Sequence, residues 1–132
     1  MAMREIKFRG RGAPRGKQWF YGDLDTHTSG VCILDNDTLH TVISETVGQF
    51  TGLLDADGRE IYEGDIVEIL PQFSAKQGLK RKFHLPAVVR WDERRARFVV
   101  ISKEILDSIP DSECVSVIGN VHDNPELLEV EA

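Results

Sequence analysis

The residues most able to do chemistry are four histidines, two cysteines and many acids that stand beside glycines. Cys32 and His40 are eight residues apart, so they could form a thiol–imidazole dyad only if their strands pair closely. Zinc needs three or four ligands, which His27, Cys32 and His40 would supply with irregular spacing. Cys32 lies in an apolar run, where a small buried thiol is the ordinary role. We therefore expect neither nucleophilic catalysis nor a metal site.

The acidic clusters and the glycine-rich segment do not meet the spacing of ion-binding or phosphate-binding loops. Counted from Asp55, the sixth residue is Glu60, where an EF-hand requires glycine. The segment Gly10–Gly16 misses a dinucleotide loop by one residue, because Arg15 stands where the third glycine belongs. Acids beside glycines are typical of turns, where carboxylates accept backbone N–H bonds. The sequence thus predicts no cofactor and no enzyme, with a hydrolase using histidine and acidic residues as a remote alternative.

Length and composition limit the class of protein. The chain has 132 residues, of which 41% are hydrophobic and 29% charged, so it can bury the core of one domain without metal or disulfide support. Its apolar runs are far shorter than the roughly 18 residues that would span a bilayer. The start lacks an apolar signal segment, and the two cysteines form no spacing pattern. We expect a cytoplasmic protein that does not bind membranes.

The net charge of −6 conceals four blocks of alternating sign. Residues 1–20 carry six basic residues against one acid, and residues 21–70 carry eleven acids against one arginine. Residues 71–103 hold nine basic residues against two acids, and residues 104–132 hold eight acids and no base. Two readings remain open. Neighbouring strands balance their charges internally, or the two basic blocks converge on one face that meets phosphates or an acidic partner.

Hydrophobic periodicity favours strands nearly everywhere. Apolar residues alternate with polar ones in short runs separated by turn residues, which is the pattern of antiparallel sheets. We expect strands around 5–9, 18–24, 31–34, 39–43, 46–51, 66–70, 85–91, 97–101 and 115–118. The predicted class is all-β, with an antiparallel meander followed by a small SH3-like barrel in the C-terminal half.

The connections carry further expectations. Pro71 to Lys82 reads as a basic loop, and Lys103 to Ser108 as a single helical turn. A short C-terminal helix is expected, with Asn124 as its cap and Pro125 in its first position. The chain is predicted to be a single domain, 1–132, with a subdivision into a meander, 1–60, and a barrel with its helical turn, 61–132.

Binding residues are predicted at two places. Arg94 and Arg95 stand between Trp91 and Phe98, and aromatic platforms beside cations suit single-stranded nucleic acid. The second place is a polar rim. Its members would be Gln49, Glu60, Asp65 and the cluster Arg59, Tyr62 and Glu63, where Tyr62 is expected to be an exposed aromatic anchor among charges. The alternative is that the glycine–acid pairs of this region are corners of the sheet.

Six segments distributed over the whole chain resemble the YopX family. They are Met3–Gly10 (MREIKFRG), Trp19–Leu24 (WFYGDL), Thr46–Leu53 (TVGQFTGL), Asp57–Val67 (DGREIYEGDIV), Val89–Asp92 (VRWD) and Val117–Leu128 (VIGNVHDNPELL). The resemblance implies a small β-rich accessory protein of bacteriophages and prophages, acting in the bacterial host cell, with no established activity and with self-assembly as an expectation. The Gly10–Gly16 loop and the Pro71–Lys82 loop depart from the family pattern, so the resemblance assigns no role to either.

The function expected from these observations is that of a non-catalytic protein-interaction module that self-assembles and engages a phage or host protein. The segment Thr38–Ile43 is a candidate for assembly, because an exposed edge strand can pair with a second chain. The alternative function is that of a small β-barrel that binds single-stranded nucleic acid.

Overall fold

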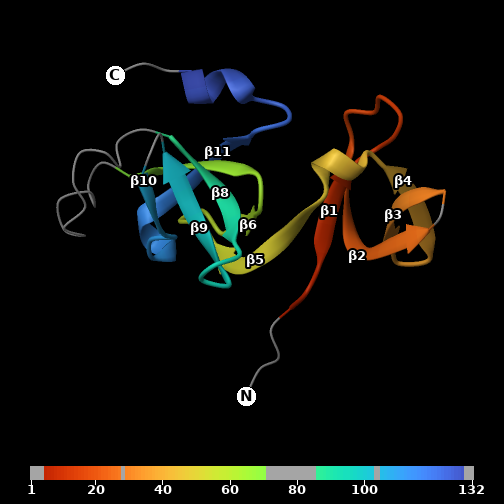
Figure 1. Ribbon diagram of the computed structural model, residues 1–132, viewed down its shortest axis with the longest axis horizontal. Coiled ribbons are helices and arrows are strands. Elements are labelled where there is room, and N and C mark those ends of the chain that lie inside the picture. The colour runs from red at the N-terminus through yellow and green to blue at the C-terminus, as the bar shows by residue number, and fades with distance from the viewer. Residues whose placement is uncertain (1–4, 28, 71–85, 103–104, 130–132) are drawn as a thin grey trace. The chain divides into compact units, whose positions relative to one another are not determined.

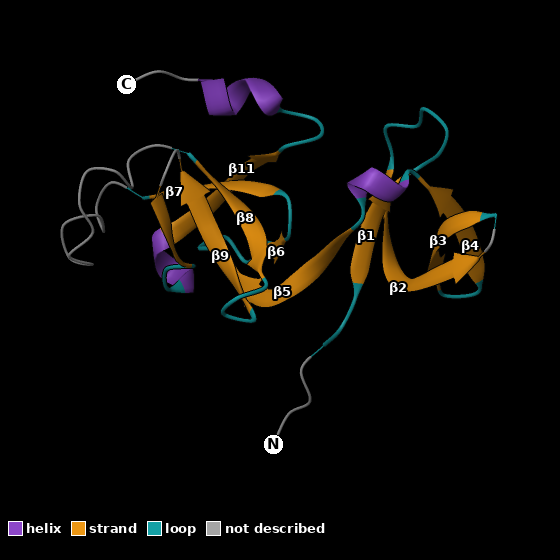
Figure 2. Cartoon of the chain, viewed as in Figure 1, coloured by secondary structure: helices purple, strands orange, loops and turns teal. Residues whose placement is uncertain are grey.

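The computed structural model describes residues 5–27, 29–70, 86–102 and 105–129. In these ranges the regular structure consists of eleven β-strands and three short 3₁₀ helices (Figure 1 and Figure 2). The all-β class predicted from the sequence is confirmed. None of the helices in the described ranges has the length and apolar character needed to cross a membrane.

The chain divides into two compact units, Met1–Gly52 and Leu53–Ala132. The first contains β1 (Phe8–Arg11), β2 (Trp19–His27), β3 (Gly30–Asp35), β4 (Thr38–Val42), the 3₁₀ helix η1 (Ser44–Thr46) and the start of β5 (Gly48–Leu54). The second contains β6 (Glu60–Tyr62), β7 (Asp65–Ile69), β8 (Ala87–Asp92), β9 (Arg97–Ser102), β10 (Ile105–Ser108), η3 (Ser112–Cys114), β11 (Val115–Asn120) and η4 (Pro125–Glu129). The subdivision 1–60 and 61–132 stays a prediction, because compactness does not show that either part folds alone.

The first unit is an antiparallel meander with the strand order β4-β3-β2-β1-β5, and the order continues along β5 to β6. The end of β4 returns to the end of β1 through a bridge between Gly12 and Val42. Gly10 permits this approach, because a Cβ atom there would lie 2.8 Å from a methyl carbon of Val42. The first strand, expected around 5–9, therefore ends later than predicted. β1 continues to Arg11, and the missing side chain lets β4 cross over it.

The second unit has the strand order β10-β9-β8-β7-β11. Four consecutive strands pair as neighbours, and β11 returns to the first of them, as the SH3-like barrel prediction requires. Its core is a cluster of buried apolar side chains, which are Ile61 of β6 together with Val67, Ile69, Ala87, Val89, Val100 and Val115 of the five-stranded sheet. Alternation along the strands of this sheet places Val67 and Ile69 on one face of β7, and Ala87 and Val89 on one face of β8, which is the period-two pattern of the sequence.

The single helical turn predicted for Lys103–Ser108 is wrong where the structure describes it. Residues 105–108 form β10, which pairs with the edge of β9 so that Leu106 stands opposite Ile101. Pairing with an open sheet edge outweighs the weak helical tendency of so short a segment. The basic loop predicted for 71–82 lies outside the described residues.

The predicted C-terminal helix is present as the 3₁₀ helix η4, with Pro125 at its first position. The role expected for Asn124 is only partly correct. Its side-chain Oδ1 accepts the N–H of Asn120, 3.2 Å away, and it is the backbone carbonyl of Asn124 that accepts the N–H of Leu127. Asn124 therefore closes the turn that precedes the helix.

Candidate functional site

The predicted rim cluster of Arg59, Tyr62 and Glu63 does not form an exposed aromatic anchor. Tyr62 is 2% exposed, and its hydroxyl donates to Glu60 Oε1 at 2.9 Å. Arg59 is exposed, but its Nη1 donates to the carbonyl of Val117 at 2.8 Å. The exposure expected for Tyr62 is wrong, because the large ring gains more by burial when its hydroxyl still finds an acceptor.

Asp55 organises the corner between β5 and β6. Its Oδ1 accepts the N–H groups of Asp57 and Arg59, and its Oδ2 accepts that of Val117, each at 2.9 Å. Burial raises the pKa of this carboxyl, but the three backbone donors and the Arg59 guanidinium together outweigh burial, so the pKa lies below its ordinary value. Asp55 is thus a charged structural link between the β5–β6 corner and β11.

Two further turns use the same chemistry. The buried carboxylate of Asp65 accepts the N–H of Tyr62 at 2.7 Å, which closes the β6–β7 turn. After β11, the side-chain oxygen of Asn120 accepts the N–H groups of His122 and Asp123. These polar side chains serve as backbone acceptors, so the geometry favours the reading of glycine–acid pairs as sheet corners.

Cys32 and His40 do not meet in a dyad. β3 and β4 pair as the dyad would require, but Cys32 stands opposite Thr41 and His40 stands opposite Ile33. Neighbours along a strand point to opposite faces, so the Cys32 thiol and the His40 imidazole lie on different sides of the sheet. Among the described residues, no group of three or more His, Cys, Asp or Glu side chains could hold a metal ion. Burial raises the pKa of Cys114, with Glu113 and Asp111 adding to the effect, which keeps this thiol protonated.

The predicted cluster around Arg94 and Arg95 is assembled at the tip of the β8–β9 hairpin. Trp91 and Phe98 are directly opposite each other, with ring centroids 5.0 Å apart in an edge-to-face contact. Asp92 accepts the N–H of Arg94 and, at 2.9 Å, a hydrogen bond from Nη1 of Arg95. The Arg95 hydrogen bond is the largest effect that lowers the pKa of Asp92. We call Trp91, Arg94, Arg95 and Phe98 the hairpin tip.

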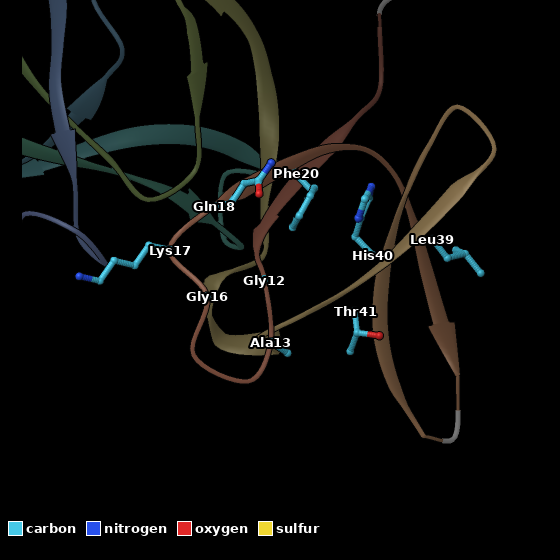
Figure 3. Close-up of a pocket in the computed structure, with 9 residues that line it drawn as sticks. All are labelled: Gly12, Ala13, Gly16, Lys17, Gln18, Phe20, Leu39, His40 and Thr41. Atoms are coloured by element: carbon cyan, nitrogen blue, oxygen red, sulfur yellow. The ribbon is translucent and has the colours of Figure 1, made fainter.

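A groove of about 530 Å³ lies in the first unit (Figure 3). It separates the β1–β2 connection from β4. We call it the β4 groove, and its lining residues are Gly12, Ala13, Gly16, Lys17, Gln18, Phe20, Leu39, His40 and Thr41. The rings of Phe20 and His40 are stacked, with centroids 3.8 Å apart and planes within 10°. In Figure 3 these rings lie side by side, while the Lys17 side chain extends away from them.

Glycines shape this groove, which gives the Gly10–Gly16 segment a structural role. The N–H of Gly16 donates to the carbonyl of Gly12 at 2.8 Å, and a Cβ atom at Gly16 would lie 2.9 Å from that same oxygen. A Cβ atom at Gly12 would lie 3.2 Å from the Phe20 ring. Sequence reasoning missed the groove, because the contact between Phe20 and His40 depends on a strand register that periodicity does not supply. The one available signal was a glycine-rich turn directly before an aromatic strand.

β4 is the last strand in its sheet order, and only half of its outer edge is covered. The carbonyl of Thr41 accepts the N–H of Ala13, and the N–H of Ile43 donates to the carbonyl of Arg11. Backbone groups alternate in direction along a strand, so Leu39 also directs its N–H and C=O away from β3. In the described part of the chain, β3 is the one strand that pairs with Thr38, Leu39 and His40. The edge expected at Thr38–Ile43 is therefore shorter than predicted.

Comparisons with known proteins agree with this architecture. A family model described as YopX protein matches residues 16–129. The crystal structure of protein EF1440 from Enterococcus faecalis is similar in fold, with a TM-score of 0.51 and 21% sequence identity over 96% of this chain and 99% of that chain. A search of curated proteins gives no match. Because the family model covers most of the chain and the resemblance of the six sequence segments agrees with it, the protein belongs to the YopX family.

Proposed function

We propose that the protein acts by binding, without catalysis, and that it associates with a second copy of itself through the outer edge of β4 while engaging a phage or host protein. The observation that carries the self-association is the half-covered edge of β4 beside the β4 groove. A strand edge with one neighbour presents backbone donors and acceptors that a second strand can satisfy.

Two-fold symmetry gives this pairing a definite register. When two copies of β4 pair in antiparallel fashion about Leu39, the N–H and C=O of each Leu39 bond to those of the other. This pairing covers the free stretch Thr38–His40 of each edge, and Asp37 of each copy then lies at the end of that stretch, next to Thr41 of the other. Thr41 is bonded to Ala13, at the start of the loop that carries Arg15 and Lys17. Asp35 ends β3 and Asp37 lies in the turn that follows, so acids of one copy meet bases of the other at both ends of the pairing.

Side chains at this edge are compatible with an interface. Leu39 is 50% exposed, which is unusual for a leucine near the middle of a strand. Asp35, Asp37, Arg15 and Lys17 are all exposed. Apolar contact at the centre and opposite charges around it is the usual composition of a small specific interface.

The absence of catalysis is supported by what the acidic side chains do. Asp55 and Asp65 are buried and hold backbone N–H groups, which leaves them poorly placed to exchange protons with a substrate. Their exposed neighbour Asp57 lies 3.9 Å from Arg59, at the surface. A carboxylate with lowered pKa that is saturated by backbone donors is a poor general base.

The test is sedimentation of the full chain over a wide concentration range, for the wild type, Leu39→Lys and Leu24→Lys. Lysine on an edge strand opposes pairing. Leu24 is a matched control for the added charge, since it is an exposed leucine of the same unit that lies on β2 and not on the edge of β4. We expect dimers for the wild type and Leu24→Lys, and monomers for Leu39→Lys. A wild type that stays monomeric at high concentration contradicts the self-association.

A further inference from the structure

We propose that the hairpin tip binds single-stranded nucleic acid, with a base stacked on Trp91 and adjacent phosphates on Arg94 and Arg95. This function is independent of the self-association through β4, since all its residues lie in the second unit. The inference rests on the exposure, packing and charge of four side chains.

The indole of Trp91 is a prepared stacking surface. Trp91 is 45% exposed, although it follows the buried Val89 on the same face of β8. Phe98 contacts it edge to face, at an angle of 69°, so the second ring steadies the indole without lying parallel to it. A base can stack on an exposed aromatic face whatever its sequence, and such stacking is the main device of single-strand binders.

Cations stand at the turn that follows Trp91. Arg94 is exposed, and its backbone N–H is fixed by Asp92, so the position of this residue is defined while its guanidinium faces solvent. Arg95 is held against Asp92 at 2.9 Å. Asp92 thereby holds the backbone of Arg94 and the guanidinium of Arg95 in the turn that directly follows Trp91, and guanidinium groups bind phosphate oxygens well.

The arrangement favours nucleic acid over an extended peptide. β8 and β9 each have a strand on both sides over part of their length, and only the short stretches next to the turn pair on one side alone, which is little edge for strand addition. The hairpin tip presents one exposed ring and two cations at a short turn. Stacking needs only an accessible ring face, whereas peptide recognition needs an edge or a pocket.

The other face of the hairpin supplies a matched control. Arg90 precedes Trp91 on β8, is exposed, and points to the opposite face because directions alternate along a strand. Its replacement by glutamate changes the charge of the protein as much as the replacement of Arg94 does. A difference between the two variants therefore reports the location of the charge, and not its amount.

The experiment is fluorescence anisotropy of labelled oligothymidylate and oligouridylate with the full chain, from low to physiological salt. We expect low-salt binding that weakens about tenfold or more in Trp91→Ala, as the loss of one stacked base implies, and much less in Trp91→Phe. Arg94→Glu should weaken binding and reduce the steepness of the salt dependence by about 0.7, the value for one phosphate contact on a single strand. Arg90→Glu should change neither as much.

Several results would overturn the proposal. One is no binding of either oligonucleotide at low salt. Another is binding that Arg90→Glu weakens as much as Arg94→Glu, since that would indicate a nonspecific charge effect. A third is preferential binding of a polyglutamate peptide used as competitor, which would assign the hairpin tip to an acidic protein. Arg94 is exposed, so its variant remains informative if Trp91→Ala fails to fold.

Discussion

The two units of the chain use a similar strand plan and complete it to different extents. In each, consecutive strands pair as neighbours and a later strand returns to the first. β11 returns to β7 over five residue pairs, whereas β4 returns to β1 through the bridge between Gly12 and Val42. Of the fifteen buried hydrophobic residues in the described part of the chain, Ile33, Val42 and Phe50 lie in the first unit and the other twelve in the second.

This difference separates the more stable unit from the unit that we expect to self-associate. The second unit is stabilised by a large apolar core and also by the hydrogen bond that links Asp55 to Val117 of β11. The first unit depends more on strand register, on the close approach at Gly10 and on the turn at Gly16. A sheet that is only partly closed retains an edge and a groove that a partner can use. We therefore expect the first unit to be the weaker part of the structure and the site of self-association.

The largest expected effect is a core truncation that compares the two units directly. Ile61 and Ile33 are both isoleucines with 0% exposure, one in each unit. Ile61→Ala should lower the free energy of unfolding by about 2–5 kcal/mol, the usual cost of removing a core isoleucine side chain. Ile33→Ala should lower the free energy of unfolding clearly less, because the described part of the first unit holds only two other buried hydrophobic residues, Val42 and Phe50. Urea denaturation measures the free energy of unfolding of both variants. Equal losses would contradict the proposed difference in stability between the two units.

The next effect concerns the corner at Asp55. Asp55→Asn places an amide N–H where Val117 needs an acceptor, so we expect a loss of about 1–3 kcal/mol, as for a buried donor left without its partner. Asp57→Asn is the matched control, because Asp57 is exposed and its side chain is 3.9 Å from Arg59. Thermal unfolding near neutral pH separates the two variants. A loss at position 57 as large as that at position 55 would contradict the role of the corner.

Asp55 also predicts the direction of a pH effect. Its pKa is lowered in the folded state, so the unfolded chain takes up the proton more readily. Ionised Asp55 stabilises the folded state. This contribution is complete at pH values above 3.8, the ordinary pKa of an aspartate in the unfolded chain, and it is lost as the pH falls through the lower pKa of the folded state. Urea unfolding across this acidic range should show a steeper loss for the wild type than for Asp55→Asn. Parallel curves would show that Asp55 contributes no such stabilisation.

A smaller effect is expected where the first unit closes. Gly10→Ala places a Cβ atom 2.8–2.9 Å from Val42 Cγ2 and Cβ, so β4 must move away from β1. Overpacking of this kind costs about 1–3 kcal/mol, at the lower end where a strand can shift. Amide hydrogen exchange should accelerate at Ala13 and Ile43, which donate across the closure. Exchange at Val121, bonded to Gly64 in the second unit, should stay unchanged, and acceleration there would contradict local opening.

Sequence reasoning identified most of the strands because period-two alternation follows directly from burial on one face. It failed where pairing decides the outcome. β10 is a strand because β9 offers it an edge, and Tyr62 is buried because Glu60 accepts its hydroxyl bond. The open edge of β9 exists only in the folded sheet, and the closeness of Glu60 to Tyr62 in sequence does not show that the ring is buried.

The candidate surfaces were predictable to unequal degrees. The hairpin tip was found because its arginines and aromatics are neighbours in sequence, and a short hairpin keeps sequence neighbours together. The β4 groove was not found, since Phe20 and His40 belong to strands that β3 separates in the sheet order and meet only through the folded register. The ion pairs Lys7–Glu5, Arg59–Asp57 and Arg95–Asp92 each lie within one short segment, so these three pairs do not link one charge block to another.

The central claim, that two copies of β4 pair about Leu39, has a direct test in disulfide crosslinking. In a hydrogen-bonded antiparallel pair the two Cα atoms are about 5.5 Å apart, within the range that a disulfide spans. With Cys32 replaced by serine, oxidised Leu39→Cys should yield a covalent dimer, while Thr38→Cys, displaced from the two-fold axis, should stay monomeric. Equal crosslinking at both positions, or none at Leu39→Cys, would contradict the proposed pairing.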